Sequence, residues 1–236
     1  MEYTINIKGR LMDLSTPQVM GILNVTPDSF YSGSRKQTEM EIAQRANQII
    51  EEGGSIIDVG AFSTRPGADE VSEEEEGRRL KFALDIVRRE QPDAAVSVDT
   101  YRPTLARKCI EEWGADIIND VSEGGITGIV NVPLEQRQEE YPEMFRVVGE
   151  LKVPYILMSV QPTLETMMKG FAKEVQQLRD LGAKDIILDP GFCFGKNLIQ
   201  NYQIYNEMEK LNVMELPVLV GISRKSMIYK LLGGDA

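Results

Sequence analysis

The chain has 236 residues, and 37 acidic against 26 basic side chains give it a formal charge of −11. A composition of 42% hydrophobic and 27% charged residues is typical of a folded globular protein, and the length suits one large domain. The acidic balance argues against a nucleic-acid surface, which needs clustered lysine and arginine. There is no histidine, which excludes any mechanism that uses imidazole as base, nucleophile or metal ligand.

The first residues predict a short hairpin and no targeting segment. Residues 3–12 alternate between apolar and polar types, which predicts an antiparallel hairpin that turns near Gly9. This stretch lacks the apolar core of a signal peptide, and no apolar run reaches the length of a membrane helix. Cys109 and Cys193 match neither a zinc spacing nor a disulfide framework. We therefore expect a cytoplasmic protein with two free thiols, and no membrane partner.

The rest of the chain alternates between short apolar runs and helical patterns. Near-continuous apolar runs indicate strands of a parallel sheet that are buried on both faces. These predicted strands cover residues 19–23, 55–60, 94–100, 116–120, 155–159, 185–190 and 217–223. The helical patterns between them cover residues 38–52, 72–90, 103–113, 141–151, 165–181 and 200–212.

Seven strand–helix units indicate a TIM-type (β/α)8 barrel rather than an open sheet. Ser72 followed by Glu75 is a capping-box pattern, so we interpret the acidic run that follows Ser72 as a helix start rather than a metal site. A closed barrel of this type needs eight strands. The sequence therefore predicts one barrel domain over residues 1–236, with an N-terminal hairpin, whose last strand and helix are missing at the C-terminus.

Polar residues stand at the ends of nearly all the predicted strands. In α/β barrels the chemistry lies at the carboxyl ends of the strands, and several polar groups there favour a functional site. Asp99, Asn119, Asp189 and Lys225 suit a planar heterocycle with several hydrogen-bond donors and acceptors. Other loop residues suit an anion or a metal-bound phosphate, namely Asn24, Thr64, Arg65 and Ser223. The GFCFGK segment at 191–196 lacks the spacing of a phosphate-binding loop.

Six blocks of the sequence resemble the dihydropteroate synthase family. They are MGILNVTPDSF (20–30), DVGAFSTRPGADEVSEEEE (58–76), SVDT (97–100), GADIINDV (114–121), IILDPGFCFGK (186–196) and PVLVGISRKS (217–226). The resemblance implies a pterin-binding barrel. It also implies a transferase of folate biosynthesis that joins 6-hydroxymethyl-7,8-dihydropterin diphosphate to para-aminobenzoate with Mg²⁺ and releases pyrophosphate.

The resemblance also assigns roles to individual residues. It places Asp99, Asn119, Asp189 and Lys225 in the pterin pocket, and associates Asn24 with Mg²⁺ and the diphosphate. The para-aminobenzoate and sulfonamide region, with the other substrate-binding positions, corresponds to Phe30, Thr64, Arg65, Pro66, Met158, Phe194, Gly221 and Ser226. The implied mechanism is dissociative: the diphosphate leaves first, and the aryl amine captures a pterin methylene cation.

The sequence departs from the family pattern at five places. Ser159 stands where a histidine is usual, and Phe62 stands where a glutamate is common. Residues 124–141 resemble an insertion and 161–172 a shortened segment. The family's C-terminal Arg-x-His motif has no counterpart. Two alternatives therefore stay open, a pterin-binding paralogue without turnover and a methyltransferase that binds methyltetrahydrofolate. A homodimer is a weaker expectation from the family.

Overall fold

The computed structural model describes residues 3–25, 35–62, 71–124 and 141–233. They group into two compact units, an N-terminal unit of Thr4–Asn119 and a C-terminal unit of Asp120–Ala236 with which residues 1–3 are grouped.

The N-terminal unit begins with the predicted hairpin. Strand β1 (Thr4–Ile7) pairs in antiparallel fashion with β2 (Arg10–Asp13). Between them Lys8 and Gly9 have φ angles of 49° and 85°, the left-handed conformations that a two-residue hairpin turn requires. Ile5 and Ile7 are buried, so the hairpin has one apolar face and one exposed face.

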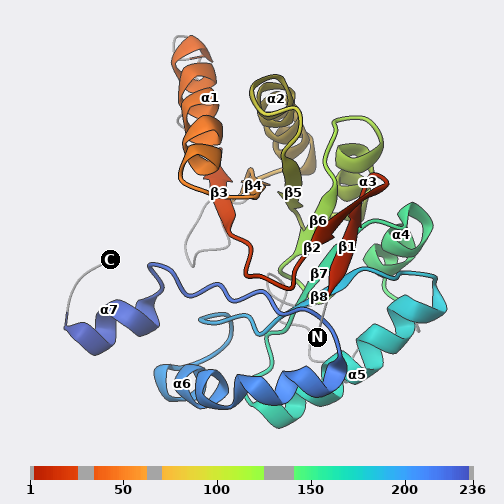
Figure 1. Ribbon diagram of the computed structural model, residues 1–236, viewed down its shortest axis with the longest axis vertical. Coiled ribbons are helices and arrows are strands. Elements are labelled where there is room, and N and C mark those ends of the chain that lie inside the picture. Colours follow the sequence, from red (N-terminus) through yellow and green to blue (C-terminus); the bar gives the residue numbers. More distant parts are fainter. Residues whose placement is uncertain (1–2, 26–34, 63–70, 125–140, 234–236) are drawn as a thin grey trace. The chain divides into compact units, whose positions relative to one another are not determined.

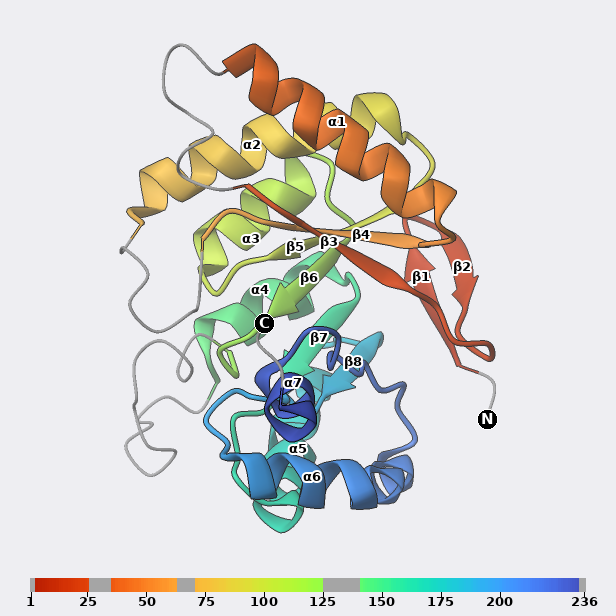
Figure 2. The ribbon, with the colours of Figure 1, turned by 90° about the vertical axis from the view of Figure 1, so that its left-hand side faces the viewer.

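Four parallel strands follow in chain order, each pair separated by a helix. They are β3 (Met20–Asn24), α1 (Arg35–Glu51), β4 (Ile56–Gly60), α2 (Glu73–Glu90), β5 (Ala95–Asp99), α3 (Pro103–Glu111) and β6 (Ile117–Asp120). Each strand pairs with the next in parallel register. Helices α1 and α2 lie against the same side of β3, β4 and β5 (Figures 1 and 2). The predicted α/β alternation is confirmed here.

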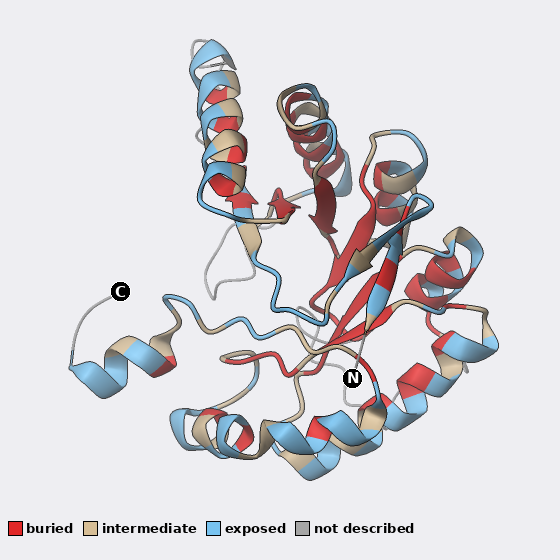
Figure 3. Ribbon diagram, viewed as in Figure 1, coloured by how far each residue is buried: buried red, intermediate tan, exposed pale blue. Residues whose placement is uncertain are grey.

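A continuous apolar core lies between these strands and helices. It joins strand residues such as Ile57 and Val98 to helix residues such as Leu80 and Leu84. All four side chains are fully buried. Figure 3 shows the buried stripe of α1 and the buried strands β4 and β5. Strand β3 differs from the prediction of burial on both faces, because Ile22 is 57% exposed while the next residue, Leu23, is buried.

The C-terminal unit continues the strand–helix alternation. It contains α4 (Glu143–Leu151), β7 (Tyr155–Met158), α5 (Leu164–Asp180), β8 (Ile186–Asp189), α6 (Leu198–Glu207), η3 (Met208–Met214) and α7 (Ser226–Leu232). Strands β7 and β8 pair in parallel, with Met158 opposite Asp189. The fully buried side chains of Phe145, Tyr155 and Phe171 come from α4, β7 and α5 and form its core.

Two expectations for the C-terminal unit need correction. The segment 217–223 was predicted to be a strand, but within the described residues it makes a single parallel bridge, Val218 to Leu188. Two backbone hydrogen bonds join it to β8, from Leu188 N to the Pro217 carbonyl at 2.9 Å and from Leu219 N to the Leu188 carbonyl at 2.8 Å. The predicted helix at 200–212 is an α-helix to residue 207 and the 3-10 helix η3 beyond it.

Side-chain caps account for several helix starts. The Ser72 hydroxyl accepts from Glu75 N at 3.2 Å, so the acidic run does begin a helix. Asn197 and Gln200 form a capping box at α6, and Asn197 therefore begins a helix directly after the GFCFGK segment. None of the helices in the described part of the chain combines the length and apolar composition needed to cross a membrane.

Candidate active site

Three predicted site residues form a row at the carboxyl ends of neighbouring strands in the N-terminal unit. Asn24 pairs in register with Gly60, Gly60 with Asp99, and Asp99 with Asn119. A β-carbon at Gly60 would lie 3.0 Å from Asn24 Oδ1 and 3.5 Å from Asp99 Oδ2, so a larger residue there would press on the Asn24 carboxamide. The absent side chain leaves room for the carboxamide and the carboxylate to approach each other.

Asp58 lies beneath this row and is joined to it by Asn119. The Asn119 amide donates to Asp58 Oδ2 at 3.1 Å, and both side chains are buried, at 6% and 5% exposed. Asp58 precedes Gly60 by two residues and so points to the same face of the sheet. Its register partner is Ser97 rather than Asp99, so the amide of Asn119 reaches back diagonally across β5.

This pair leaves two buried acceptors unused among the described residues. Asp58 Oδ1 and Asn119 Oδ1 have no hydrogen-bond partner there. Such buried atoms cost about 1–3 kcal/mol each unless a ligand or water supplies a donor. Burial raises the pKa of the Asp58 carboxyl, while the Ser97 hydroxyl and the Asn119 amide lower it. The pair is therefore suited to a ligand that carries N–H groups.

The C-terminal unit holds the other two predicted pocket residues. Asp189 ends β8, and its Oδ1 accepts from Gly191 N at 2.8 Å. Burial raises the pKa of Asp189, against the lowering effects of the Gly191 N–H, Lys225 and Lys196. Lys225 donates to the Phe192 carbonyl at 2.9 Å, and its Nζ lies 4.2 Å from the centroid of the Phe194 ring. Lys225 and Phe194, both predicted site residues, thus meet through a cation–π contact.

The remaining predicted residues of this unit have different surroundings. The Ser226 hydroxyl lies 3.6 Å from Cys193 Sγ, which ties the start of α7 to the loop that contains Phe194. Met158 is fully buried and Gly221 is exposed. The substrate-binding roles of these three residues stay predictions. Four other predicted residues lie outside the described parts of the chain, namely Phe30, Thr64, Arg65 and Pro66.

Two residues near these clusters were not among the predicted site residues. One is Asp58, which is the hydrogen-bond partner of Asn119. Lys196 donates from Nζ to three backbone carbonyls, those of Ser159, Gly191 and Phe194, at 2.8, 3.0 and 3.0 Å. The signal for Asp58 was its polar side chain in an otherwise apolar strand. No spacing in the sequence indicates the contacts of Lys196.

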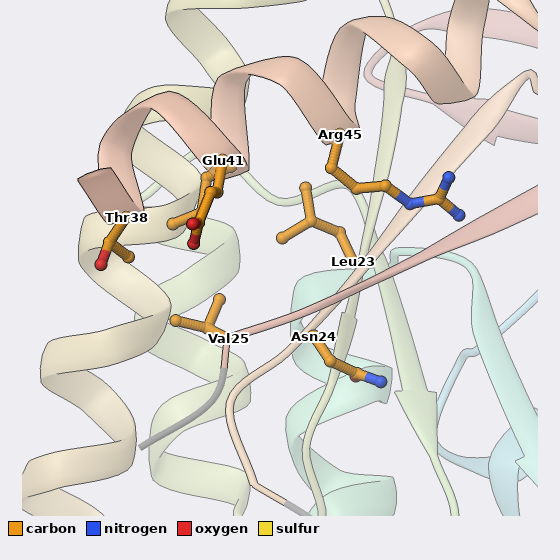
Figure 4. Close-up of a pocket in the computed structure, with 7 residues that line it drawn as sticks. Leu23, Asn24, Val25, Thr38, Glu41 and Arg45 are labelled. Carbon is orange, nitrogen blue, oxygen red and sulfur yellow. The ribbon is translucent and has the colours of Figure 1, made fainter. Parts of the chain in front are cut away.

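A pocket of the N-terminal unit lies on the other side of β3. Leu23, Asn24 and Val25 of β3 line it, together with Thr38, Glu41, Ile42 and Arg45 of α1. Figure 4 shows Leu23 and Val25 on the side of β3 that faces α1, whereas the Asn24 side chain points the opposite way. The pocket therefore lies mainly between β3 and α1 and borders the row of polar residues at Asn24.

Phe62, which departs from the family pattern, belongs to an aromatic stack. Its ring meets Tyr101 edge to face at a centroid distance of 5.1 Å, and the Arg102 guanidinium lies 4.9 Å from the centroid of the Tyr101 ring. Arg102 is held in turn by the buried Glu76, at 2.8 Å. An aromatic contact thus anchors the chain where a charged residue is common in the family.

Comparison with known proteins identifies the family. The model of the pterin binding enzymes matches residues 20–236. The dihydropteroate synthase of Escherichia coli strain K12 is 38% identical over 240 residues, which cover 95% of this chain and 79% of the relative. This chain belongs to the pterin binding enzymes.

Two solved structures have folds similar to that of this chain. The Xanthomonas albilineans dihydropteroate synthase with 4-aminobenzoic acid has a TM-score of 0.85 and 31% identity, covering 100% of this chain and 84% of that one. The Yersinia pestis dihydropteroate synthase with a sulfonamide drug complex has a TM-score of 0.79 and 34% identity, covering 98% and 83%. The predicted TIM-barrel fold class and the predicted transferase of the dihydropteroate synthase type are confirmed by these matches.

Proposed function

We propose that this chain condenses 6-hydroxymethyl-7,8-dihydropterin diphosphate with para-aminobenzoate, and that the Asp58–Asn119 pair supplies pterin-binding groups. The single observation that carries the proposal is the buried Asp58–Asn119 pair, with one unused acceptor oxygen on each side chain. A pterin offers ring and amino N–H groups, the donors that these oxygens lack. Membership of the family makes a pterin the ligand class to test first.

Within the C-terminal unit, Asp189 and Lys225 are proposed to bind complementary groups of a pterin. The Asp189 carboxylate accepts pterin N–H groups, and the Lys225 ammonium donates to a ring acceptor. Lys225 also lies over the face of Phe194, so one cation links the proposed pterin group to the proposed para-aminobenzoate region. The Gly191 N–H holds the Asp189 carboxylate in place before the ligand arrives, which limits the entropy lost on binding.

The donor set around Asn24 fits Mg²⁺. The ion prefers oxygen ligands and usually combines one or two protein oxygens with waters and substrate phosphates. Asn24 Oδ1 and Asp99 Oδ2 both lie close to Gly60, and both are oxygens of the required kind. When bound there, Mg²⁺ supplies positive charge that stabilises the departing diphosphate. We propose Asn24 as its protein ligand, with Asp99 beside it.

The residues of the chain contribute chiefly electrostatics to the proposed dissociative reaction. Carboxylates near the pterin stabilise the positive charge that spreads over the ring as the diphosphate leaves. The aryl amine of para-aminobenzoate then bonds to the methylene carbon and loses a proton. The amine is already nucleophilic when neutral, so the reaction does not require an imidazole base, in agreement with a chain that contains no histidine.

The test is direct synthesis of dihydropteroate. The purified chain is mixed with the dihydropterin diphosphate, Mg²⁺ and labelled para-aminobenzoate, and labelled product is followed by chromatography. We expect product, and we expect none from Asp189→Ala or Lys225→Ala chains that stay folded by circular dichroism. Tight pterin binding without product would instead favour the paralogue without turnover. Methyl transfer from methyltetrahydrofolate would favour the methyltransferase.

The compartment and assembly state belong to the same proposal. The two cysteines are free thiols, one of them the buried Cys109, and we propose a reducing compartment such as the cytoplasm. A homodimer stays a prediction, to be tested by light scattering.

A further inference from the structure

Lys196 places its charged end among backbone carbonyls inside the C-terminal unit. Its Nζ donates to the carbonyls of Ser159, Gly191 and Phe194 at 2.8, 3.0 and 3.0 Å. An ammonium group has three N–H bonds, so each is matched to one carbonyl. Ser159 follows β7, whereas the other two carbonyls belong to the loop after β8. The contacts therefore join the ends of two neighbouring strands.

The two segments approach each other so closely that a side chain is excluded between them. Gly191 has a φ of +63°, and a β-carbon on it would lie 2.2 Å from the Ser159 carbonyl oxygen. Glu123 holds the β7 side of this contact, because its Oε1 accepts from Ser159 Oγ at 3.1 Å and from Val160 N at 2.8 Å. The backbone here has little freedom once Lys196 is in place.

The loop that Lys196 holds carries two of the proposed substrate-binding residues. Asp189 immediately precedes it and accepts from Gly191 N, and Phe194 lies within it. Lys225 also donates to a carbonyl of this loop, that of Phe192, at 2.9 Å. The carbonyls of Gly191 and Phe194 that Lys196 binds are therefore parts of the backbone that orients the Asp189 carboxylate and the Phe194 ring.

We propose that Lys196 is a positioning residue, whose three hydrogen bonds hold the loop after β8 so that Asp189 and Phe194 face pterin and para-aminobenzoate. The proposal rests on the proposed function for the identity of the two substrates. Among the described residues the three hydrogen-bond acceptors of Lys196 Nζ are backbone carbonyls, so its effect on the reaction passes through Asp189 and Phe194.

The protonation state of Lys196 makes this role dependent on pH. Burial lowers the pKa of Lys196 to about 8; Asp189, Glu123 and Cys193 act to raise it, and Lys225 acts to lower it further. A neutral amine keeps two N–H bonds, so one of the three carbonyls loses its donor above that pH. We expect the loop, and with it substrate affinity, to loosen as Lys196 deprotonates.

The experiment compares Lys196→Met, Lys196→Arg and the control Lys184→Met, which removes an exposed lysine of the same unit. Lys196→Met is expected to raise the KM for para-aminobenzoate and the Kd for the pterin about 10–100-fold. Arginine keeps the charge but spreads its donors over a planar fork, so it should not restore affinity. The control should stay within about twofold of the parent chain. Parent affinity in either Lys196 variant would overturn the proposal.

The pH profile separates positioning from a general loss of stability. In the parent chain both constants should rise between pH 7 and 9, whereas in Lys196→Met they should be high and independent of pH. Identical pH profiles in the two chains would contradict the proposal. If Lys196→Met does not fold, carbon-13 resonances of labelled lysines decide, with Lys196 assigned from the spectrum of Lys196→Arg. A titration midpoint of Lys196 above pH 10 would then contradict the proposed pH dependence of the loop.

Failure of the proposed function has a different signature. Pterin affinity and the lysine titration are measured without turnover. A chain that binds pterin in a Lys196-dependent way but makes no dihydropteroate would refute the synthase activity and leave the role of Lys196 intact. Synthesis of dihydropteroate with no dependence on Lys196 would refute only the role of Lys196.

Discussion

The amide of Asn119 lies 3.1 Å from the carboxylate of Asp58, although 61 residues separate them and a third strand runs between their own. The contact fixes the carboxamide so that its oxygen, like the second carboxylate oxygen, stays available to a ligand. Both side chains are buried, so the two free acceptors are held in place before any substrate binds.

Replacing Asp58 by asparagine tests the ligand role of this carboxylate. The substitution keeps the size of the side chain and an acceptor for Asn119 but removes the charge. Loss of one charge-assisted hydrogen bond should weaken pterin binding about 10–100-fold. Calorimetric titration with the dihydropterin would check this. The exposed Asp85→Asn on α2 is the control, and equal affinity in both variants would contradict the assignment.

Asp58→Asn should weaken pterin binding but raise the free energy of unfolding at neutral pH. Folding raises the pKa of Asp58 from its usual 3.8, so its contribution to stability is present below pH 3.8 and is lost as the pH rises through the raised value. Asp58→Asn has no carboxyl to ionise, so it does not lose this stability as the pH rises. We expect the variant to unfold at higher urea concentration than the parent at pH 7, with the two curves converging toward pH 4. A parent chain that is the more stable at pH 7 would contradict this.

Replacing Asn24 tests its proposed role as a ligand of Mg²⁺. Chelation with EDTA should abolish dihydropteroate synthesis, and excess Mg²⁺ should restore it. Asn24→Ala removes the proposed ligand oxygen and should raise the Mg²⁺ concentration for half-maximal rate about tenfold. Its effect on pterin affinity without diphosphate should be small, which separates the metal role from damage to the pterin pocket. An unchanged Mg²⁺ dependence would exclude Asn24 as ligand.

A buried ion pair anchors the opposite end of the N-terminal sheet. Arg88 of α2 pairs with Asp116, whose side chain is 2% exposed and also binds Lys8 at 2.8 Å and Val96 N at 2.8 Å. Arg88→Met should lower the free energy of unfolding by about 3 kcal/mol, because a buried carboxylate then loses its strongest partner. The adjacent Arg89, which is 55% exposed, pairs with Glu39 and Glu90 on the surface.

Arg89→Met is therefore the matched control for Arg88→Met. Surface pairs contribute about 1 kcal/mol or less, so this variant should unfold nearly as the parent does. Urea unfolding of the three chains at pH 7 compares them directly. Similar losses in the two variants would mean that helix α2 itself, rather than the buried pair, accounts for the effect.

The order of strands and helices could be predicted from the sequence, because it depends on local patterns. Apolar runs marked β3 to β8, and Ser72 marked the start of α2. The segment 217–223 has an equally apolar run, yet it forms only one bridge to Leu188. A strand exists only where a neighbour supplies hydrogen bonds along its length, and that neighbour is not encoded in the run itself.

The sequence by itself determined which residues stand at the strand ends, and so Asn24, Asp99, Asn119 and Asp189 as candidates. Only the tertiary structure decided how they are used. The register brings Asn24, Gly60 and Asp99 into one row, the diagonal amide of Asn119 adds Asp58, and a single ammonium from Lys196 joins three carbonyls of two loops. The reason is physical: residue type follows from local burial, whereas a hydrogen bond between distant residues depends on strand register and loop closure.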